Sequence, residues 1–495
     1  MFRPAGGSVL VFGTCFSTGF AILALELTAL RLLAPYFGAS NYVAGIVINS
    51  ILLALAAGYL LGGHAADAYK SDKAPYVVIC VSAICLTVMQ VFYSPLLRAL
   101  AGRSLPLGVA LAMVLIFFLP ITLLAFIPPY FVKMLSQGDS VGKTAGRIYA
   151  LSTLGSIAGG LSTTFLLLPA HGSRITFQAT VILLYVNAAA GLACSGGRAF
   201  ATLLLMLIPL VFLPPAGRSS SYLHREESAY NVITITESQG RRYLRLNDGF
   251  GHHSQTLDPV SMMSDEYYDF FLVAQMLSHA RHTLILGNGA GTSMMQTAHF
   301  FPTNIDGVEI DPRLSALGRS YFGLQLTDAM RIYHEDARSF LIRKSNRYDV
   351  IYVDVYAGNP YVPFHVSTVE FYDGVRRALV PGGIAAVNLP FYAAGTELED
   401  RLLSTISAVF PSTYLSGGMA YAFAAEVSKE QLEARLTDRA FPPALELLVK
   451  RTLAHLRWVT RGSAGEIFTD DHAPVEKMTF ELLEQRPDRG RQIIE

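Results

Sequence analysis

The sequence has few charged side chains and few cysteines. Of 495 residues, 15% are Asp, Glu, Lys or Arg, which is low against about a quarter in soluble globular proteins. The formal net charge is zero, so we expect no nucleic-acid partner. All 4 cysteines lie inside apolar runs without a Cys-x-x-Cys pair or a Cys/His spacing, and we predict neither a disulfide framework nor a metal site.

Long apolar runs fill the first part of the chain, before about Pro215, whereas nearly all Asp and Glu follow it. A helix that crosses a hydrocarbon core about 30 Å thick needs about 20 residues. We therefore predict a helical membrane domain over residues 1–215 with about seven spans, the last one short. The runs are 7–33, 43–63, 74–93, 107–131, 148–169, 175–194 and 199–214.

Small residues recur at close spacing inside two of these runs. Such spacing lets membrane helices approach closely, so we interpret these glycines as packing positions. They are Gly58, Gly62 and Gly63, and then Gly155, Gly159 and Gly160.

The pattern changes to alternation after a turn-rich linker at residues 216–227. Residues 231–236 and 242–246 have the pattern of two strands joined by a tight turn, which predicts a β-hairpin subdomain with a lead-in helix over 228–280. From 281 to 495, short apolar strands alternate with helical periodicity. That alternation predicts a mostly parallel, doubly wound sheet, hence an α/β Rossmann-like domain of the class I methyltransferase type.

A glycine-rich turn follows the first strand of that domain. Residues 283–291 read TLILGNGAG, and the next strand ends in GVEID at 307–311. Glycines let the backbone approach a ligand, and Glu309 lies where a carboxylate can accept hydrogen bonds from two ribose hydroxyls. The spacing predicts a nucleoside site, whose turn contains Gly287, Gly289 and Gly291.

Two more carboxylates, Asp336 and Asp354, follow the third and fourth predicted strands. The carboxyl ends of parallel strands line the ligand crevice of an open sheet, so Glu309, Asp336 and Asp354 should converge. Asp336 with the Ala337 amide could read the edge of a purine. Asp354 would then lie nearest the reacting end of the ligand.

Two further segments carry polar residues whose role the pattern leaves open. His365 ends a stretch rich in turn formers, 357–365, and either acts as a base or fixes that loop. The stretch TDDHAPVE at 469–476 is either a lid that clamps an amine or a capped junction between a loop and a helix.

These motifs resemble those of the spermidine synthases, the polyamine aminopropyltransferases. The hairpin, LNDG at 246–249, Gln255, DE at 265–266, the glycine-rich turn, VEID at 308–311, DA at 336–337 and YDVIYVD at 348–354 come in that family's order. The whole chain resembles the membrane-fused bacterial branch, in which stretches similar to 26–38, 142–160, 363–368 and 469–476 recur.

The resemblance implies specific roles for the predicted site. Gln255 and Glu309 would hold the ribose of decarboxylated S-adenosylmethionine, Asp336 and Ala337 would hold its adenine, and Asp354 would be the general base. The reaction implied is transfer of an aminopropyl group to an amine such as putrescine, with release of methylthioadenosine and without a metal.

Three departures from the family pattern affect the amine site. Ala290 stands where the family has an Asp, Asn359 with Pro360 replaces a second Asp, and Asp269 with Phe270 replaces a Tyr-His pair. Two of these changes remove carboxylates that would pair with a cationic amine. The candidate substrate residues are Asp269, Asn359, His365, Asp470, Asp471 and Glu476.

Two other functions remain open on this sequence. The pocket could take ordinary S-adenosylmethionine and transfer a methyl group, because Ala290 leaves room for its carboxylate. Alternatively the chain is a polyamine carrier or sensor with a nucleoside-binding domain. We expect a multi-pass protein in the lipid bilayer of the cell (inner) membrane, with the catalytic domain in the cytoplasm, where the cofactor is made. A homodimer is one option for its assembly.

Overall fold

The computed structural model describes residues 7–38, 40–69, 71–101, 103–136, 141–214, 222–247, 251–356, 362–460 and 466–485. Contacts divide the chain into two compact units, Met1–Ser220 and Ser221–Glu495. This boundary agrees with the change from long apolar runs to short alternating segments.

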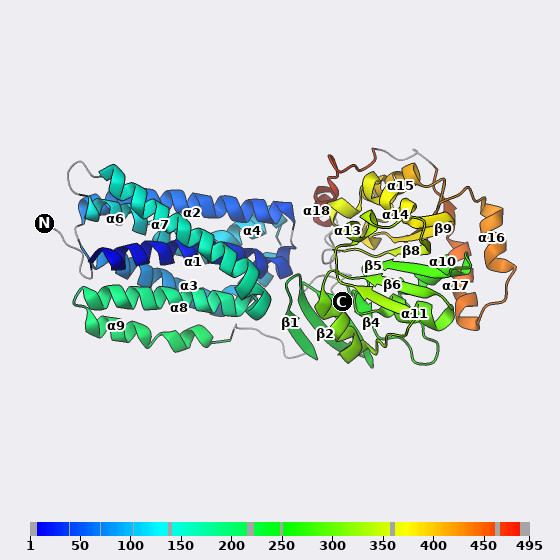
Figure 1. Ribbon diagram of the computed structural model, residues 1–495, viewed down its shortest axis with the longest axis horizontal. Helices are drawn as coiled ribbons and strands as arrows, with labels where there is room; N and C mark the ends of the chain where they lie inside the picture. Colours follow the sequence, from blue (N-terminus) through cyan, green and yellow to red (C-terminus); the bar gives the residue numbers. More distant parts are fainter. Residues whose placement is uncertain are drawn as a thin grey trace. The chain divides into compact units, whose positions relative to one another are not determined.

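The described part of the first unit is helical (Figure 1). Its elements are α1 (Gly7–Phe37), α2 (Asn41–Ala68), α3 (Ala74–Ala101), α4 (Leu105–Met113), η1 (Val114–Phe118), α5 (Leu119–Ala125), α6 (Ile127–Leu135), α7 (Val141–Ser162), η3 (Thr163–Leu167), α8 (Leu168–Cys194), α9 (Arg198–Leu205) and η4 (Ile208–Phe212).

Within the described ranges, 5 helical stretches are long and apolar enough to cross a membrane. The predicted runs 148–169 and 175–194 fall in one of them, Val141–Cys194, which has non-helical backbone at Gly172 (φ 73°, ψ 177°). Both α7 and α8 pack against α1 (Figure 1), so this stretch supplies two neighbouring helices. The predicted seventh span is the shorter Arg198–Phe212.

Helices α1 and α7 pack with their backbones almost in contact. A Cβ atom at Gly155 would lie 2.0 Å from the carbonyl oxygen of Phe16, and one at Gly159 would lie 2.3 Å from that of Phe20. Gly58 and Gly62 approach the backbone of the α5–α6 segment in the same way. The packing prediction is confirmed for these four glycines and for Gly160, whose Cβ atom would lie 2.6 Å from Cδ2 of Leu23. It is wrong for Gly63, because no atom of the described residues lies within 4 Å of its Cβ position.

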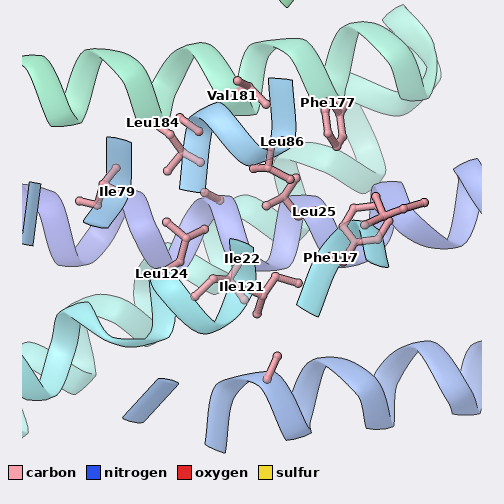
Figure 2. Close-up of a cluster of buried hydrophobic side chains, with 14 of the residues drawn as sticks. Ile22, Leu25, Ile79, Leu86, Phe117, Ile121, Leu124, Phe177, Val181 and Leu184 are labelled. Carbon is pink, nitrogen blue, oxygen red and sulfur yellow. The ribbon is translucent and has the colours of Figure 1, made fainter. Parts of the chain in front are cut away.

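Apolar side chains from α1, α3, η1, α5 and α8 fill the centre of this unit (Figure 2). Two polar side chains among them, Gln90 and Gln178, both donate hydrogen bonds to the carbonyl oxygen of Val211. Because a backbone carbonyl without a partner is costly in apolar surroundings, these two amides stabilise the end of the last helical segment at η4.

The second unit contains an 8-stranded sheet with order β12-β10-β11-β9-β8-β5-β6-β7. Neighbours from β7 to β9 pair in parallel, and β11, β10 and β12 pair antiparallel. The prediction of a mostly parallel sheet is confirmed. The strands are β5 (His282–Leu286), β6 (Asn304–Val308), β7 (Met330–Tyr333), β8 (Tyr348–Val353), β9 (Leu379–Asn388), β10 (Ser412–Ser416), β11 (Met419–Phe423) and β12 (Arg457–Trp458).

Helices cover both faces of this sheet. The core on one face includes residues of α13, α14, α15 and α18, and the core on the other includes residues of α10, α11, α16 and α17. The α-helices described in this unit are α10 (Tyr268–Met276), α11 (Thr292–Phe300), α12 (Pro312–Leu317), α13 (Ala337–Ile342), α14 (Val369–Ala378), α15 (Glu397–Val409), α16 (Lys429–Thr437), α17 (Pro443–Ala454) and α18 (Val475–Gln485).

A smaller antiparallel sheet precedes the large one. Its 4 strands, in the order β1-β2-β3-β4, are β1 (His224–Glu227), β2 (Val232–Ser238), β3 (Arg241–Leu246) and β4 (Ser254–Gln255). The predicted hairpin is confirmed as β2 and β3. The predicted linker is wrong at 224–227, because these residues form β1 and pair with β2. Ile233 and Leu244 belong to a core cluster that includes Ala290 of the glycine-rich turn.

Candidate active site

The glycine-rich turn after β5 needs glycine for two reasons. Gly287 (φ 84°) and Gly289 (φ 53°) adopt left-handed backbone, which other residues rarely do. A Cβ atom at Gly287 would also lie 2.0 Å from the carbonyl oxygen of Asp354, and one at Gly289 would lie 2.7 Å from Oγ of Ser254. The turn therefore runs against both the end of β8 and the small sheet. Gly291 (φ 95°) precedes α11.

Glu309 closes this turn from the end of β6. Its side chain is buried, and its two oxygens accept hydrogen bonds from the amides of Gly289 (2.8 Å) and Asp311 (3.0 Å). Burial raises the pKa of Glu309 to about 7. A carboxylate has about four acceptor positions, so Glu309 keeps acceptor capacity for ribose hydroxyls beside the glycine-rich backbone.

Gln255 lies on the other side of the turn, at the end of β4, and is fully buried. Its backbone amide donates to Oγ1 of Thr292 (3.0 Å), and its Nε2 donates to the carbonyl oxygen of Ser264 (2.5 Å). Among the described residues, its Oε1 atom has no hydrogen-bond partner. A buried acceptor without a protein partner is expected where a ligand or water supplies the donor.

Asp336 begins α13 as its N-cap and accepts a hydrogen bond from the amide of Ser339 (2.9 Å). Nε2 of His365 lies 3.8 Å from its second oxygen, and this pairing with His365 lowers the pKa of Asp336 to about 2. Ala337 follows at the first helical position and is buried. The structure thus places His365 against Asp336, which agrees with the interpretation of His365 as a residue that fixes its loop.

Asp354 follows β8 at the carboxyl edge of the sheet and is partly buried. Oδ1 accepts a hydrogen bond from Nδ2 of Asn388 (2.9 Å), and Oδ2 accepts one from the hydroxyl of Tyr267 (3.1 Å). Burial raises the pKa of Asp354 to about 6, although both hydrogen bonds favour the ionised form. The Asp354 carboxylate is therefore held in one orientation, and its pKa lies close to neutral pH.

Two of these contacts were missed at the level of sequence. Asn388 ends β9, the parallel neighbour of β8, so the rule that located Asp354 also applies to it. Tyr267 lies at the start of α10, far from any strand end, and no sequence signal points to it.

The predicted substrate residues do not gather at Asp354 as a group. Asp470 pairs with Arg338 and accepts a hydrogen bond from Oγ1 of Thr368 (2.8 Å). Arg338 also donates to the carbonyl oxygen of His365 (2.9 Å), so the 469–476 stretch ties the His365 loop to α13. Asp471 is exposed, Glu476 lies in the first turn of α18, and Asn359 lies outside the described residues.

Asp269 is committed to the protein. One oxygen accepts hydrogen bonds from Ser264 N (2.8 Å), Ser264 Oγ (2.6 Å) and Gln296 Nε2 (2.6 Å), and the other accepts one from Asp265 N (3.0 Å). The side chain is buried. We therefore correct its proposed role: Asp269 holds a turn, and its acceptor positions are largely used before any amine arrives.

Comparison with known proteins assigns this site to a family. Residues 263–422 match the Spermine/spermidine synthase domain. The chain is a spermidine synthase-like protein. It is 32% identical over 282 residues to a "Probable polyamine aminopropyl transferase" of Bifidobacterium longum (strain NCC 2705), a match that covers 52% of this chain and 62% of the relative. The chain thus spans less than two thirds of that relative.

Another relative matches both units of this spermidine synthase-like chain. It is a "Polyamine aminopropyltransferase" of Mycobacterium tuberculosis (strain CDC 1551 / Oshkosh), 26% identical, and the match covers 91% of this chain and 90% of that one. Among solved structures, a probable spermidine synthase from Corynebacterium glutamicum ATCC 13032 matches 51% of this chain and 97% of its own, at 16% identity and a TM-score of 0.38.

Proposed function

We propose that this protein is a membrane-bound aminopropyltransferase. It would transfer the aminopropyl group of decarboxylated S-adenosylmethionine to an amine such as putrescine and release methylthioadenosine. One observation carries the proposal: Asp354, with both oxygens held by hydrogen bonds, lies at the carboxyl edge of the sheet beside the glycine-rich turn of a spermine/spermidine synthase domain.

The residues present fit the nucleoside substrate. Glu309 and the unpartnered Oε1 of Gln255 are both buried, and both offer acceptors for ribose hydroxyls. The second oxygen of Asp336 lies 3.8 Å from Nε2 of His365 and has a further acceptor position for an exocyclic amine, and the Ala337 amide is a first-turn helix donor.

The chemical step requires a neutral amine, because an ammonium nitrogen has no free electron pair. The amine nitrogen attacks the carbon beside the sulfonium, the carbon–sulfur bond breaks, and sulfur keeps the electron pair as methylthioadenosine leaves. Asp354 accepts the proton from nitrogen. Its pKa of about 6 suits this task, because a general base acts best when its pKa is near the working pH. Positioning supplies the rest.

The first unit would anchor the enzyme in the bilayer. Its 5 described helical stretches of crossing length support a multi-pass protein. We place the catalytic unit in the cytoplasm, where decarboxylated S-adenosylmethionine is made.

The test is turnover by the purified full-length protein in detergent, with putrescine and either decarboxylated or ordinary S-adenosylmethionine. We expect methylthioadenosine only with the decarboxylated form. Asp354→Asn should lower this rate by about 10²-fold or more while nucleoside affinity is kept. The matched control is Asp349→Asn in the same strand, where Asp349 accepts hydrogen bonds from the amides of Arg281 and His282. Its rate should stay near that of the wild type.

Other results would select the alternatives. Methyl transfer from ordinary S-adenosylmethionine, without methylthioadenosine release, would identify a methyltransferase. Nucleoside binding without turnover on any amine would identify a carrier or sensor. The argument that Ala290 leaves room for a carboxylate has no support in the structure, because that side chain is fully buried in the core cluster with β2 and β3.

A further inference from the structure

Tyr267 makes a contact with Asp354 that neither the glycine-rich turn nor the strand ends account for. Its hydroxyl donates to Oδ2 of Asp354 over 3.1 Å. Its ring packs against Tyr268, with centroids 4.0 Å apart, and against Phe271, at 6.4 Å. Tyr267 is the N-cap residue of α10, so its position depends on how the chain enters that helix.

The segment before Tyr267 has unusual backbone. Met262 (φ 55°) and Asp265 (φ 61°) are both in the left-handed region without being glycine. Such residues are strained and persist only where the surroundings fix them. The chain therefore contains a strained turn that ends two residues before the hydroxyl donor of Asp354.

Hydrogen bonds to Asp269 hold this turn in its strained conformation. Asp269 accepts from both backbone amides of the turn, Ser264 N and Asp265 N, and from the Ser264 hydroxyl. The Ser264 carbonyl oxygen accepts from Nε2 of Gln255 (2.5 Å) and from Arg241 (2.7 Å). The turn is thus bonded to β3, β4, α10 and, through Gln296, to α11.

The bonding pattern at Asp354 shows what the turn achieves. Asn388 fixes one oxygen from within the sheet, and the backbone amide of Asp354 is bonded to Leu286. Without the hydrogen bond from Tyr267, the whole carboxylate could pivot about the hydrogen bond between Oδ1 and Asn388. A donor on each oxygen leaves the remaining acceptor positions pointing in set directions.

We propose that Tyr267 is the positioning residue that orients the Asp354 carboxylate toward the amine, and that the strained turn held by Asp269 exists to place it. The inference rests on the proposed function, because it assigns a role within that reaction. Tyr267 acts through Asp354 and needs no contact with the substrate. Its hydroxyl also stabilises the ionised carboxylate, which is the form that accepts the proton.

The experiment compares Tyr267→Phe with the matched variant Tyr268→Phe in the full-length enzyme. Each removes one hydroxyl from an adjacent, packed tyrosine; that of Tyr268 donates to the carbonyl oxygen of His252 (3.1 Å). We expect Tyr267→Phe to lower kcat about tenfold or more, since hydrogen bonds to charged groups are the stronger ones, with KM for the nucleoside substrate little changed. Tyr268→Phe should stay within about threefold of the wild type.

A pH profile separates positioning from a general loss of structure. Asp354 must be ionised to act, and losing the Tyr267 donor raises its pKa, so the acid limb of kcat/KM should move to higher pH in Tyr267→Phe. Burial raises the pKa values of the two tyrosines beside it, Tyr267 and Tyr268, well above this range. A loss of rate by the same factor at every pH, or an unmoved acid limb, would overturn the proposal.

A double-mutant cycle tests the part assigned to Asp269. If Asp269 acts through Tyr267, Asp269→Asn lowers kcat in the wild-type background and has little further effect in Tyr267→Phe. Independent, additive losses would overturn this link. Failure of the proposed function is a separate result, because it would appear as absence of methylthioadenosine from the wild-type enzyme before any variant is compared.

Discussion

The contact between α1 and α7 makes a sharp prediction about stability. The Cβ atom of alanine at position 155 would lie 2.0 Å from the carbonyl oxygen of Phe16, whereas ordinary van der Waals contact begins at 3.4 Å. The neighbour is backbone and cannot rotate away. The two helices would therefore have to separate by about 1.4 Å, the difference between these distances.

Separation of the helices would also disturb the contacts on either side. Gly19 approaches the carbonyl oxygen of Ser152 equally closely, and Oγ of Ser156 donates to the Gly19 carbonyl oxygen (3.1 Å). Overpacking of this kind costs about 1–3 kcal/mol or more, and the better helix propensity of alanine returns about 1 kcal/mol of that. Because the overlap with backbone is large, the upper half of that range applies, and we expect Gly155→Ala to destabilise the first unit by about 1–2 kcal/mol.

Thermal unfolding in detergent, followed with a thiol-reactive dye, would measure this change. Cys15 and Cys80 are buried in the first unit, so their reaction with the dye reports its unfolding, whereas Cys194 is exposed from the start. The matched control is Gly146→Ala in the same helix, where no atom of the described residues lies within 4 Å of the added atom. Equal midpoints for the two variants would refute the close approach of α1 and α7.

Other predictions concern the catalytic unit. The pKa of Asp354 is about 6 in the folded protein and ordinarily 3.8; because folding raises it, this carboxylate contributes most stability below pH 4 and loses it as pH rises through 6. Asp354→Asn should therefore raise the free energy of unfolding at pH 8, by on the order of 1 kcal/mol, while lowering turnover by about 10²-fold or more; an unchanged or lower free energy of unfolding would contradict the burial of Asp354. For the wild type, kcat/KM should fall below about pH 6, and an acid limb near pH 4 would exclude this carboxylate as the base. Gly289→Ala should weaken nucleoside binding in calorimetry much more than Gly382→Ala, which also has positive φ but open space around it. Arg338→Gln breaks a partly exposed ion pair with Asp470, so it should change stability by less than about 1 kcal/mol, and a larger loss would mean that the 469–476 stretch holds the fold together.

The sequence predicted the framework of the site because periodicity and strand-end rules act locally. Buried strands followed by glycine or a carboxylate located the glycine-rich turn, Glu309 and Asp354, and the structure places all of them along one edge of the sheet. The hairpin followed from alternation and a tight turn in the same way. The extra strand β1 was missed because its residues, HREE, are polar and show no alternation of apolar and polar side chains.

The amine side could not be predicted, because it depends on side chains that meet across the fold. Tyr267 and Asp354 are 87 positions apart. From the sequence, Asp269 looked available to bind a cation. In the structure it accepts hydrogen bonds from Ser264, Asp265 and Gln296, and these contacts depend on a turn with left-handed residues that the sequence pattern does not reveal. Hydropathy likewise divided Val141–Cys194 into two runs correctly but could not show that both pack on α1.

The pairing of α1 with α7 and α8 has a consequence for biosynthesis. Helix α1 is synthesised before its main partners, α7 and α8, which begin more than 100 residues later. Until then its glycine face at Gly19 and the hydroxyl of Ser17, which later bonds Asn187, lack their final neighbours. We therefore expect the packing of this domain to be completed only after α7 and α8 have been made. The bundle closes around α1 only when α8 is in place, and a chain truncated before α7 should be recognised as incomplete and degraded.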